Sequence, residues 1–186
     1  MNESAAVSGK VLMGWKVQTK GASVLFLLAL GGCASSKVTQ SIVVPPNSGP
    51  PIKIIAISPG GGVLGEAVGV ELFNLGYTIV DPGQTMQIAG RYNLSEIELG
   101  QPKSLDVLRE EKIDALLVVK GTSGYDGRPQ SASARVVSTA TGQIVAAVSW
   151  QNGWGGQEGS MADRQKRKDV VGAAREIAKG LRPSLR

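Results

Sequence analysis

The sequence predicts a single α/β (α+β) domain: a mixed sheet with flanking helices, one antiparallel hairpin and a C-terminal helix. Three observations support this class. Apolar, β-branched runs at 52–57 and 115–119 have the length of buried strands. A wide apolar stripe at helical spacing covers 63–75. Alternating residues at 131–138 and 143–151 flank a Thr-Gly turn, which is typical of a hairpin.

Local signals then order the rest of the chain. Gly76 is expected to end the first helix in the left-handed conformation. Ser104 is a candidate N-cap. The other expected elements are a strand at 77–80, a short helix at 84–92, a helix at about 104–111, a glycine-rich loop at 121–130 and one long last helix at 161–181.

The front of the chain has the pattern of an export signal. Three lysines precede the apolar run VLFLLAL at 24–30, which is too short to span a bilayer. The ending Leu30-Gly31-Gly32-Cys33 resembles the bacterial lipobox, in which the cysteine is acylated and becomes the first residue after cleavage. We therefore expect a signal peptide at 1–32 and lipidation of Cys33, the only cysteine. Met13 stays open as an alternative start.

A lipid on Cys33 makes the membrane the first expected partner. Residues 33–51 are rich in Ser and Pro and are interpreted as a lipid-anchored tether, followed by the α/β domain at 52–186. By analogy with bacterial lipoprotein sorting, Ala34 and Ser35 after the cysteine favour the periplasmic face of the outer membrane, and surface exposure stays open. A single cysteine permits no internal disulfide.

Charge excludes one class of function. The chain has 20 Lys and Arg against 15 Asp and Glu, and the first 32 residues hold three Lys and one Glu. The remaining 17 and 14 leave a net charge of +3 with both signs mixed, which predicts no nucleic-acid partner.

Glycines at 60, 62 and 65 match the G-x-G-x-x-G spacing of a dinucleotide site, and Asp81 lies where a ribose-binding acid is expected. Ser58 and Pro59 lengthen the turn beyond that fingerprint, and an exported chain rarely meets nicotinamide cofactors. We therefore expect no cofactor, and interpret the glycines as a tight exit from a strand into a helix. Anion binding at this turn stays open.

The residues offer no catalytic constellation. The chain contains no histidine, and its only cysteine is assigned to the lipid. The carboxylates are scattered, and Ser58 lacks a neighbouring base. The sequence therefore predicts that the protein is not an enzyme, has no metal site and has no small-molecule substrate.

Four stretches resemble a known group of α/β domains: KIIAI at 53–57, LFNLGYTIV at 72–80, IDALLVVKG at 113–121 and ARVVSTATGQIV at 134–145. The group comprises the curli-secretion (CsgG) lipoprotein family, the TolB amino-terminal domain and the LpoB-type activators of penicillin-binding proteins. The resemblance covers 52–182 and implies a non-enzymatic domain with no catalytic residues to carry over. The long membrane-inserting hairpins of the curli channel and the long tether of the activators have no counterpart here.

These observations predict a lipid-anchored module that binds another envelope protein or copies of itself. Two alternatives stay open: an accessory, possibly ring-forming subunit of a secretion or surface-polymer export complex, and an activator of a peptidoglycan synthase. Aromatic residues on loops often anchor interfaces. The candidate partner-binding residues are Tyr125, Trp150, Trp154, Arg164, Lys166, Arg167 and Lys168, with packing of both tryptophans against the core as the competing interpretation.

Overall fold

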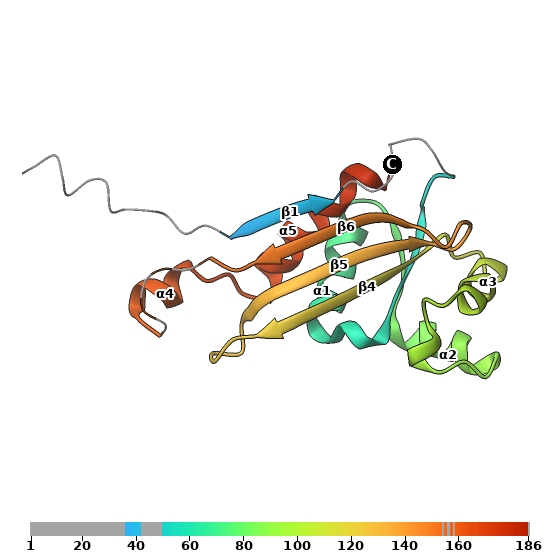
Figure 1. Ribbon diagram of the computed structural model, residues 1–186, viewed down its shortest axis with the longest axis horizontal. Helices are drawn as coiled ribbons and strands as arrows, with labels where there is room; N and C mark the ends of the chain where they lie inside the picture. Colours follow the sequence, from blue (N-terminus) through green and yellow to red (C-terminus); the bar gives the residue numbers. More distant parts are fainter. Residues whose placement is uncertain (1–35, 42–49, 154, 156, 158, 186) are drawn as a thin grey trace, which may run out of the picture. The chain divides into compact units, whose positions relative to one another are not determined.

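A six-stranded mixed sheet with helices on both faces forms the domain, which confirms the predicted α/β (α+β) class (Figure 1). The structure is a computed structural model. It describes residues 36–41, 50–153, 155, 157 and 159–185. The predicted lipidation site Cys33, the signal peptide and Trp154 lie outside the described residues.

The strand order is β1-β6-β5-β4-β2-β3. The strands are β1 (Lys37–Ser41), β2 (Ile54–Ile57), β3 (Thr78–Val80), β4 (Ala115–Ser123), β5 (Pro129–Ser138) and β6 (Ile144–Gln151). The helices are α1 (Gly62–Asn74), α2 (Pro82–Arg91), α3 (Pro102–Glu110), α4 (Met161–Lys166) and α5 (Val170–Leu181). β2 runs parallel to β3 and β4, and the other neighbours are antiparallel.

Alternation along the central strands divides the core into two layers. Ile55, Leu117 and Val119 face the layer that α1 and α5 cover, and Ala56 and Leu116 face the layer under α2 and α3. Figure 1 shows α1 and α5 behind the sheet, with α2 and α3 gathered at the end where β4 begins. Because β2 and the first part of β4, residues 115–119, are covered on both faces, their sequences are continuous apolar runs, as predicted.

A glycine lets α1 lie close to the sheet. A Cβ at Gly69 would collide with the Ile57 side chain, which is 3% exposed. Gly76 has φ +97° and follows the last turn of α1, which confirms the predicted left-handed end.

The predicted tether is wrong for residues 37–41, because they form edge strand β1, which pairs antiparallel with β6. Val38 explains the docking, since it packs beside Gly180 of α5, where a Cβ would come within 3.3 Å of its Cγ1. The composition of this segment hid a strand whose partner lies more than a hundred residues away in the sequence.

Two predicted helix boundaries are also wrong. α3 begins at Pro102, which has no N–H to lose at the first helical position, so Ser104 is inside the helix and not its N-cap. The Ser104 hydroxyl donates to the carbonyls of Glu98 and Gln101 at 2.7 and 2.8 Å. The long last helix is two helices, since Arg167 is extended and Asp169 caps α5 by accepting from Gly172 N at 2.8 Å.

The glycine-rich loop expected at 121–130 is shorter than predicted. β4 continues through Ser123 and β5 begins at Pro129, so only residues 124–128 form the turn. Gly127 takes φ +73° there. The predicted hairpin of β5 and β6 is confirmed, with Gly142 at φ +69° in its turn.

Candidate functional site

The turn between β4 and β5 folds against α4. The Tyr125 hydroxyl donates to Asp163 Oδ2 at 3.0 Å, and Arg167 Nη1 lies 3.8 Å from the same oxygen. The Arg167 guanidinium carbon stands 5.2 Å from the centre of the Tyr125 ring, a cation–π distance. These contacts join a surface turn to a helix that has little apolar surface of its own.

Asp163 is charged at the centre of this cluster. Burial raises the pKa of its carboxyl. Hydrogen bonds from Gly159 N, the Tyr125 hydroxyl and Gly155 N, together with the Arg167 charge, lower that pKa by more than burial raises it. The net effect holds the pKa of Asp163 below its ordinary value. The carboxylate therefore serves as a fixed acceptor that orders the surrounding loop.

Arg128 completes the connection from the other side of the turn. Its Nη1 donates to the carbonyl of Arg164 at 2.6 Å and to that of Arg167 at 2.9 Å. These are carbonyls at the end of α4, which a cation satisfies favourably. The turn thus holds α4 by side-chain contacts at both of its ends.

The exposed side chains of this turn and helix are mixed apolar and basic, and we call them together the α4 patch: Tyr125, Met161, Arg164 and Lys166. Tyr125 is 52% and Met161 80% exposed, and both basic side chains are exposed. Apolar groups surrounded by cations fit either an acidic protein surface or a membrane interface.

Two of the predicted partner-binding residues, Trp150 and Arg167, are buried, and a third, Lys168, is ion-paired while its side chain stays 38% exposed. Trp150 lies on β6 with 2% exposure, and its Nε1 donates to Glu176 Oε2 at 2.7 Å, so the competing interpretation of a core tryptophan describes it. Arg167 is 8% exposed and belongs to the cluster inside the turn. Lys168 pairs with Glu176 Oε1 at 2.7 Å. The sequence indicated that Trp150 would be buried, since it alternates with Ala146 and Val148 and therefore lies on the same face of the strand.

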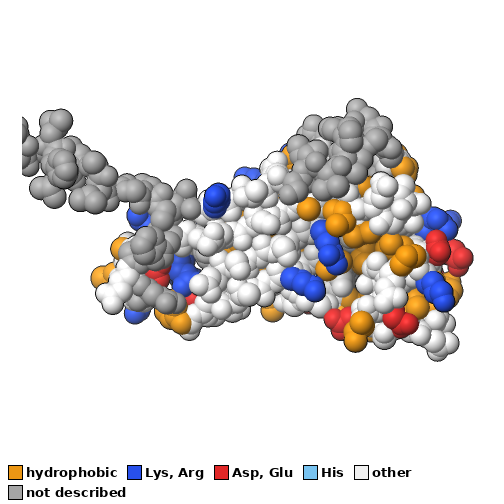
Figure 2. All heavy atoms as spheres, in the orientation of Figure 1, with side chains coloured by type: hydrophobic (Ala, Val, Ile, Leu, Met, Phe, Trp, Pro, Cys, Tyr) orange, Lys and Arg blue, Asp and Glu red, His pale blue; other side chains and the backbone are white. Residues whose placement is uncertain are grey.

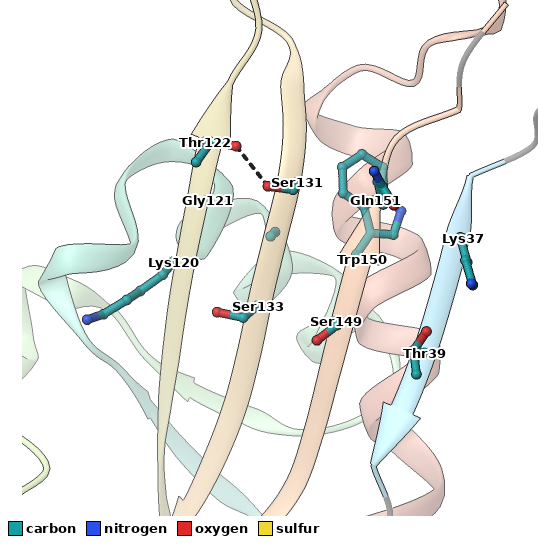
Figure 3. Close-up of a pocket in the computed structure, with 11 residues that line it drawn as sticks. Lys37, Thr39, Lys120, Gly121, Thr122, Ser131, Ser133, Ser149, Trp150 and Gln151 are labelled. Carbon is teal, nitrogen blue, oxygen red and sulfur yellow. Dashed lines mark hydrogen bonds between the residues drawn. The ribbon is translucent and has the colours of Figure 1, made fainter.

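A second surface was not anticipated. α2 and α3 cover only the start of the sheet, so the far part of that face is open, and we call it the open sheet face. It forms a shallow groove of about 510 Å³ whose lining side chains Figure 3 shows. Register places them in two rows across β1, β6, β5 and β4: Lys37, Gln151, Ser131 and Thr122, then Thr39, Ser149, Ser133 and Lys120.

Small polar side chains dominate this face. The Thr122 and Ser131 hydroxyls lie 2.8 Å apart, the dashed contact in Figure 3. Arg135 is two residues beyond Ser133 on the same face and is exposed. Figure 2 shows the surface over β4–β6 mostly in the white of backbone and uncharged polar side chains, with Lys and Arg among them, and acidic side chains at the two ends of the domain, near α2 and α3 and near α4.

Packing and capping account for several features of the glycine turn. Residues 59–61 form a single 3₁₀ turn between β2 and α1. A Cβ at Gly61 or Gly65 would be in ordinary contact with Val119. Asp81, the expected ribose acid, caps α2 by accepting from Gln84 N at 2.9 Å. The strand, turn and helix are therefore held together by packing and capping.

Among the described residues, His, Cys, Asp and Glu side chains form no group of three or more that could hold a metal ion. None of the described helices combines the length and hydropathy that a membrane span requires.

Comparison with known proteins yields no sequence relative. No family model matches the chain, and no curated protein does. Solved structures do match in shape at low identity.

Three of these neighbours illustrate the level of similarity. The PelC dodecamer from Paraburkholderia phytofirmans is 18% identical over 81% of this chain and 99% of its own, at TM-score 0.45. Lipoprotein GNA1162 from Neisseria meningitidis is 16% identical over 69% and 98%, at TM-score 0.44. The LpoB C-terminal domain from Salmonella enterica is 16% identical over 56% and 84%, at TM-score 0.42. Likeness at this level carries no argument about family or function.

Proposed function

We propose that this protein is a lipid-anchored, non-enzymatic docking module of the bacterial envelope. The main support for this proposal is the lipobox-like sequence that ends at Cys33. After three intervening residues the chain enters β1. The lipid fixes the chain to the membrane, and the strand fixes the chain to the sheet. Localisation at the periplasmic face of the outer membrane belongs to the same proposal.

The short connection sets the reach of the domain. Four residue steps separate Cys33 from Lys37, and a chain of that length can reach at most about 14 Å at about 3.4 Å per residue. β1 starts at the end of the sheet where β4 finishes and where the turn and α4 lie, because Lys37 is paired with Gln151 and through it with Ser131. The α4 patch is therefore held near the membrane and meets partners that are themselves at the membrane.

The α4 patch is the proposed docking surface for an envelope protein. It combines two exposed apolar side chains, Tyr125 and Met161, with two exposed cations, Arg164 and Lys166, which project from different sides of α4. Buried Arg167 packs against Tyr125 of the patch, Trp150 belongs to the core under α5, and Trp154, outside the described residues, stays a candidate contact.

A photo-crosslinking amino acid at Lys166 in living cells tests this role. We expect a protein adduct of one defined mass that disappears with Arg164→Glu and with Cys33→Ser. The matched control is the same amino acid at Lys103 on α3. Equal adducts at both positions, or an adduct that survives Arg164→Glu, would contradict the proposed surface.

The export-subunit alternative is favoured by the two edges of the sheet. β1 and β3 occupy opposite edges, and such edges allow head-to-tail pairing that closes into a ring. Light scattering of the detergent-solubilised lipoprotein separates the two cases, because a closed ring gives a single large multiple of the protomer mass. The synthase-activator alternative requires a partner within the reach set by the short connection.

A further inference from the structure

The open sheet face presents cations that no described group neutralises. Lys37, Lys120 and Arg135 are exposed and have no ion pair among the described residues. The four strands that form the face contain no Asp or Glu at all. Positive charge spread over a flat surface with no opposing charge favours an anionic ligand.

We propose that the open sheet face binds a carboxylate-bearing polysaccharide. Its cations provide charge-assisted hydrogen bonds for carboxylates, and Arg135 can bind one in the bidentate mode. Between the cations lie hydroxyl and amide groups, which both donate and accept hydrogen bonds, as do sugar hydroxyls. The hydroxyls belong to Thr39, Thr122, Ser131, Ser133 and Ser149.

The register gives the face the form of an extended platform. Neighbouring strands are about 4.8 Å apart, so a row across four strands spans about 14 Å. Lys37 on β1 begins the first row, and Lys120 on β4 ends the second. A chain molecule laid across β1 to β4 would meet cations at both sides and polar groups between them.

The composition of the face argues against a protein partner. Protein interfaces depend on large buried anchors such as Trp, Tyr and Arg in pockets. All exposed large apolar side chains of the described chain lie elsewhere; Val38, on β1, points to the α5 side. A peptide strand would add at the sheet edge, where backbone groups are free, and not across its face.

The experiment uses the full processed lipoprotein in a non-ionic detergent and three probes. These are oligogalacturonate, which carries carboxylates, neutral dextran, and polyglutamate. We expect oligogalacturonate to bind and dextran not to bind. Lys120→Gln with Arg135→Gln should weaken oligogalacturonate binding about tenfold. The control, Lys103→Gln with Lys179→Gln, removes two exposed cations from α3 and α5 and should leave it unchanged.

A second variant separates sugar recognition from attraction of any polyanion. Ser133→Ala with Ser149→Ala removes two paired, exposed hydroxyls and leaves the charge intact. It should weaken oligogalacturonate binding severalfold and leave polyglutamate unchanged. Tighter binding of polyglutamate than of oligogalacturonate would overturn the proposal in favour of an acidic peptide.

Two other results would overturn it. One is that the variant with Lys120→Gln and Arg135→Gln binds oligogalacturonate as tightly as the control with Lys103→Gln and Lys179→Gln. The other is a change of molar mass in that variant by light scattering, which would make the face an interface between copies. Binding at this face does not require the lipid, so its failure leaves the anchor proposal standing, and an unlipidated Cys33 leaves this proposal standing.

Discussion

The indole Nε1 of Trp150 donates a hydrogen bond to Glu176 Oε2 at 2.7 Å and so joins β6 to α5. The other carboxylate oxygen of Glu176, Oε1, forms a salt bridge with Lys168 Nζ at 2.7 Å. A tryptophan in the layer of α1 and α5 thus has its one polar atom satisfied, and the carboxylate also holds the segment that leads from α4 into α5.

Trp150→Ala should unfold the domain more easily and not merely weaken partner binding. Removing a fully buried tryptophan costs about 3–5 kcal/mol of the free energy of unfolding. Trp150→Phe keeps much of the packing and should cost less. Urea unfolding followed by circular dichroism measures both. Ser149→Ala, the exposed neighbour, is the control and should change stability by less than about 0.5 kcal/mol. A stability for Trp150→Ala close to that control would contradict its place in the core.

Stability should fall in acid partly through Glu176. Burial raises the pKa of Glu176. Hydrogen bonds from Lys168, Ser36 and Trp150 and the Lys168 charge together lower that pKa by more, so it lies below the ordinary 4.5. The unfolded state then binds more protons as the pH falls below about 4.5, and the stabilisation is lost as the pH passes through the folded pKa. Glu176→Gln should show a shallower loss of urea midpoint between about pH 7 and about pH 3. An unchanged slope would show that the carboxylate does not titrate with folding.

Gly69→Ala should destabilise the domain although alanine favours helices. The new Cβ would collide with Ile57, and overpacking costs about 1–3 kcal/mol, more than the roughly 1 kcal/mol that alanine contributes. Ile57→Val removes the nearest atom and should recover part of the loss in a double-mutant cycle. Gly65→Ala on the same helix is the matched control. Its Cβ would meet Val119 and Ile57 no closer than 3.7 Å, so it should be neutral or stabilising. Equal effects at both glycines would contradict the close approach at Gly69.

The backbone amides of β1 should exchange slowly with solvent. Residues 37–41 are paired with 147–151 of β6, whereas an unstructured tether would exchange at once. Hydrogen exchange of the intact protein measures this directly. Ser149→Pro in β6, opposite Thr39 at the middle of the register, should disturb the pairing and serves as a perturbing control. Immediate exchange over 37–41 in the unaltered protein would restore the tether interpretation and lengthen the reach of the domain.

Local patterns predicted the central elements well. The runs around Ile55 and Leu116 have buried-strand composition, and the turn at Gly142 has the left-handed signal of a hairpin. What the sequence alone could not give is long-range pairing. β1 is a strand because β6 and α5 offer an edge and a groove, which no pattern within residues 37–41 encodes.

The candidate surfaces were predictable only in part. The basic run from Arg164 to Lys168 was visible, but the turn of Tyr125 buries Arg167 and leaves Arg164 and Lys166 exposed. The open sheet face was missed because its hydroxyls and cations come from strands far apart in the chain. The alternation of Ser131, Ser133 and Arg135 was the only local signal, and it did not show whether a helix would cover them.

Intact-mass measurement of the protein extracted from bacterial membranes tests the central claim most directly. We expect a chain that begins at Cys33 and carries a diacylglyceryl thioether and an amide-linked acyl chain, with no thiol left to alkylate. A chain that retains the residues before Cys33, or that carries an unmodified thiol at that position, would contradict the account.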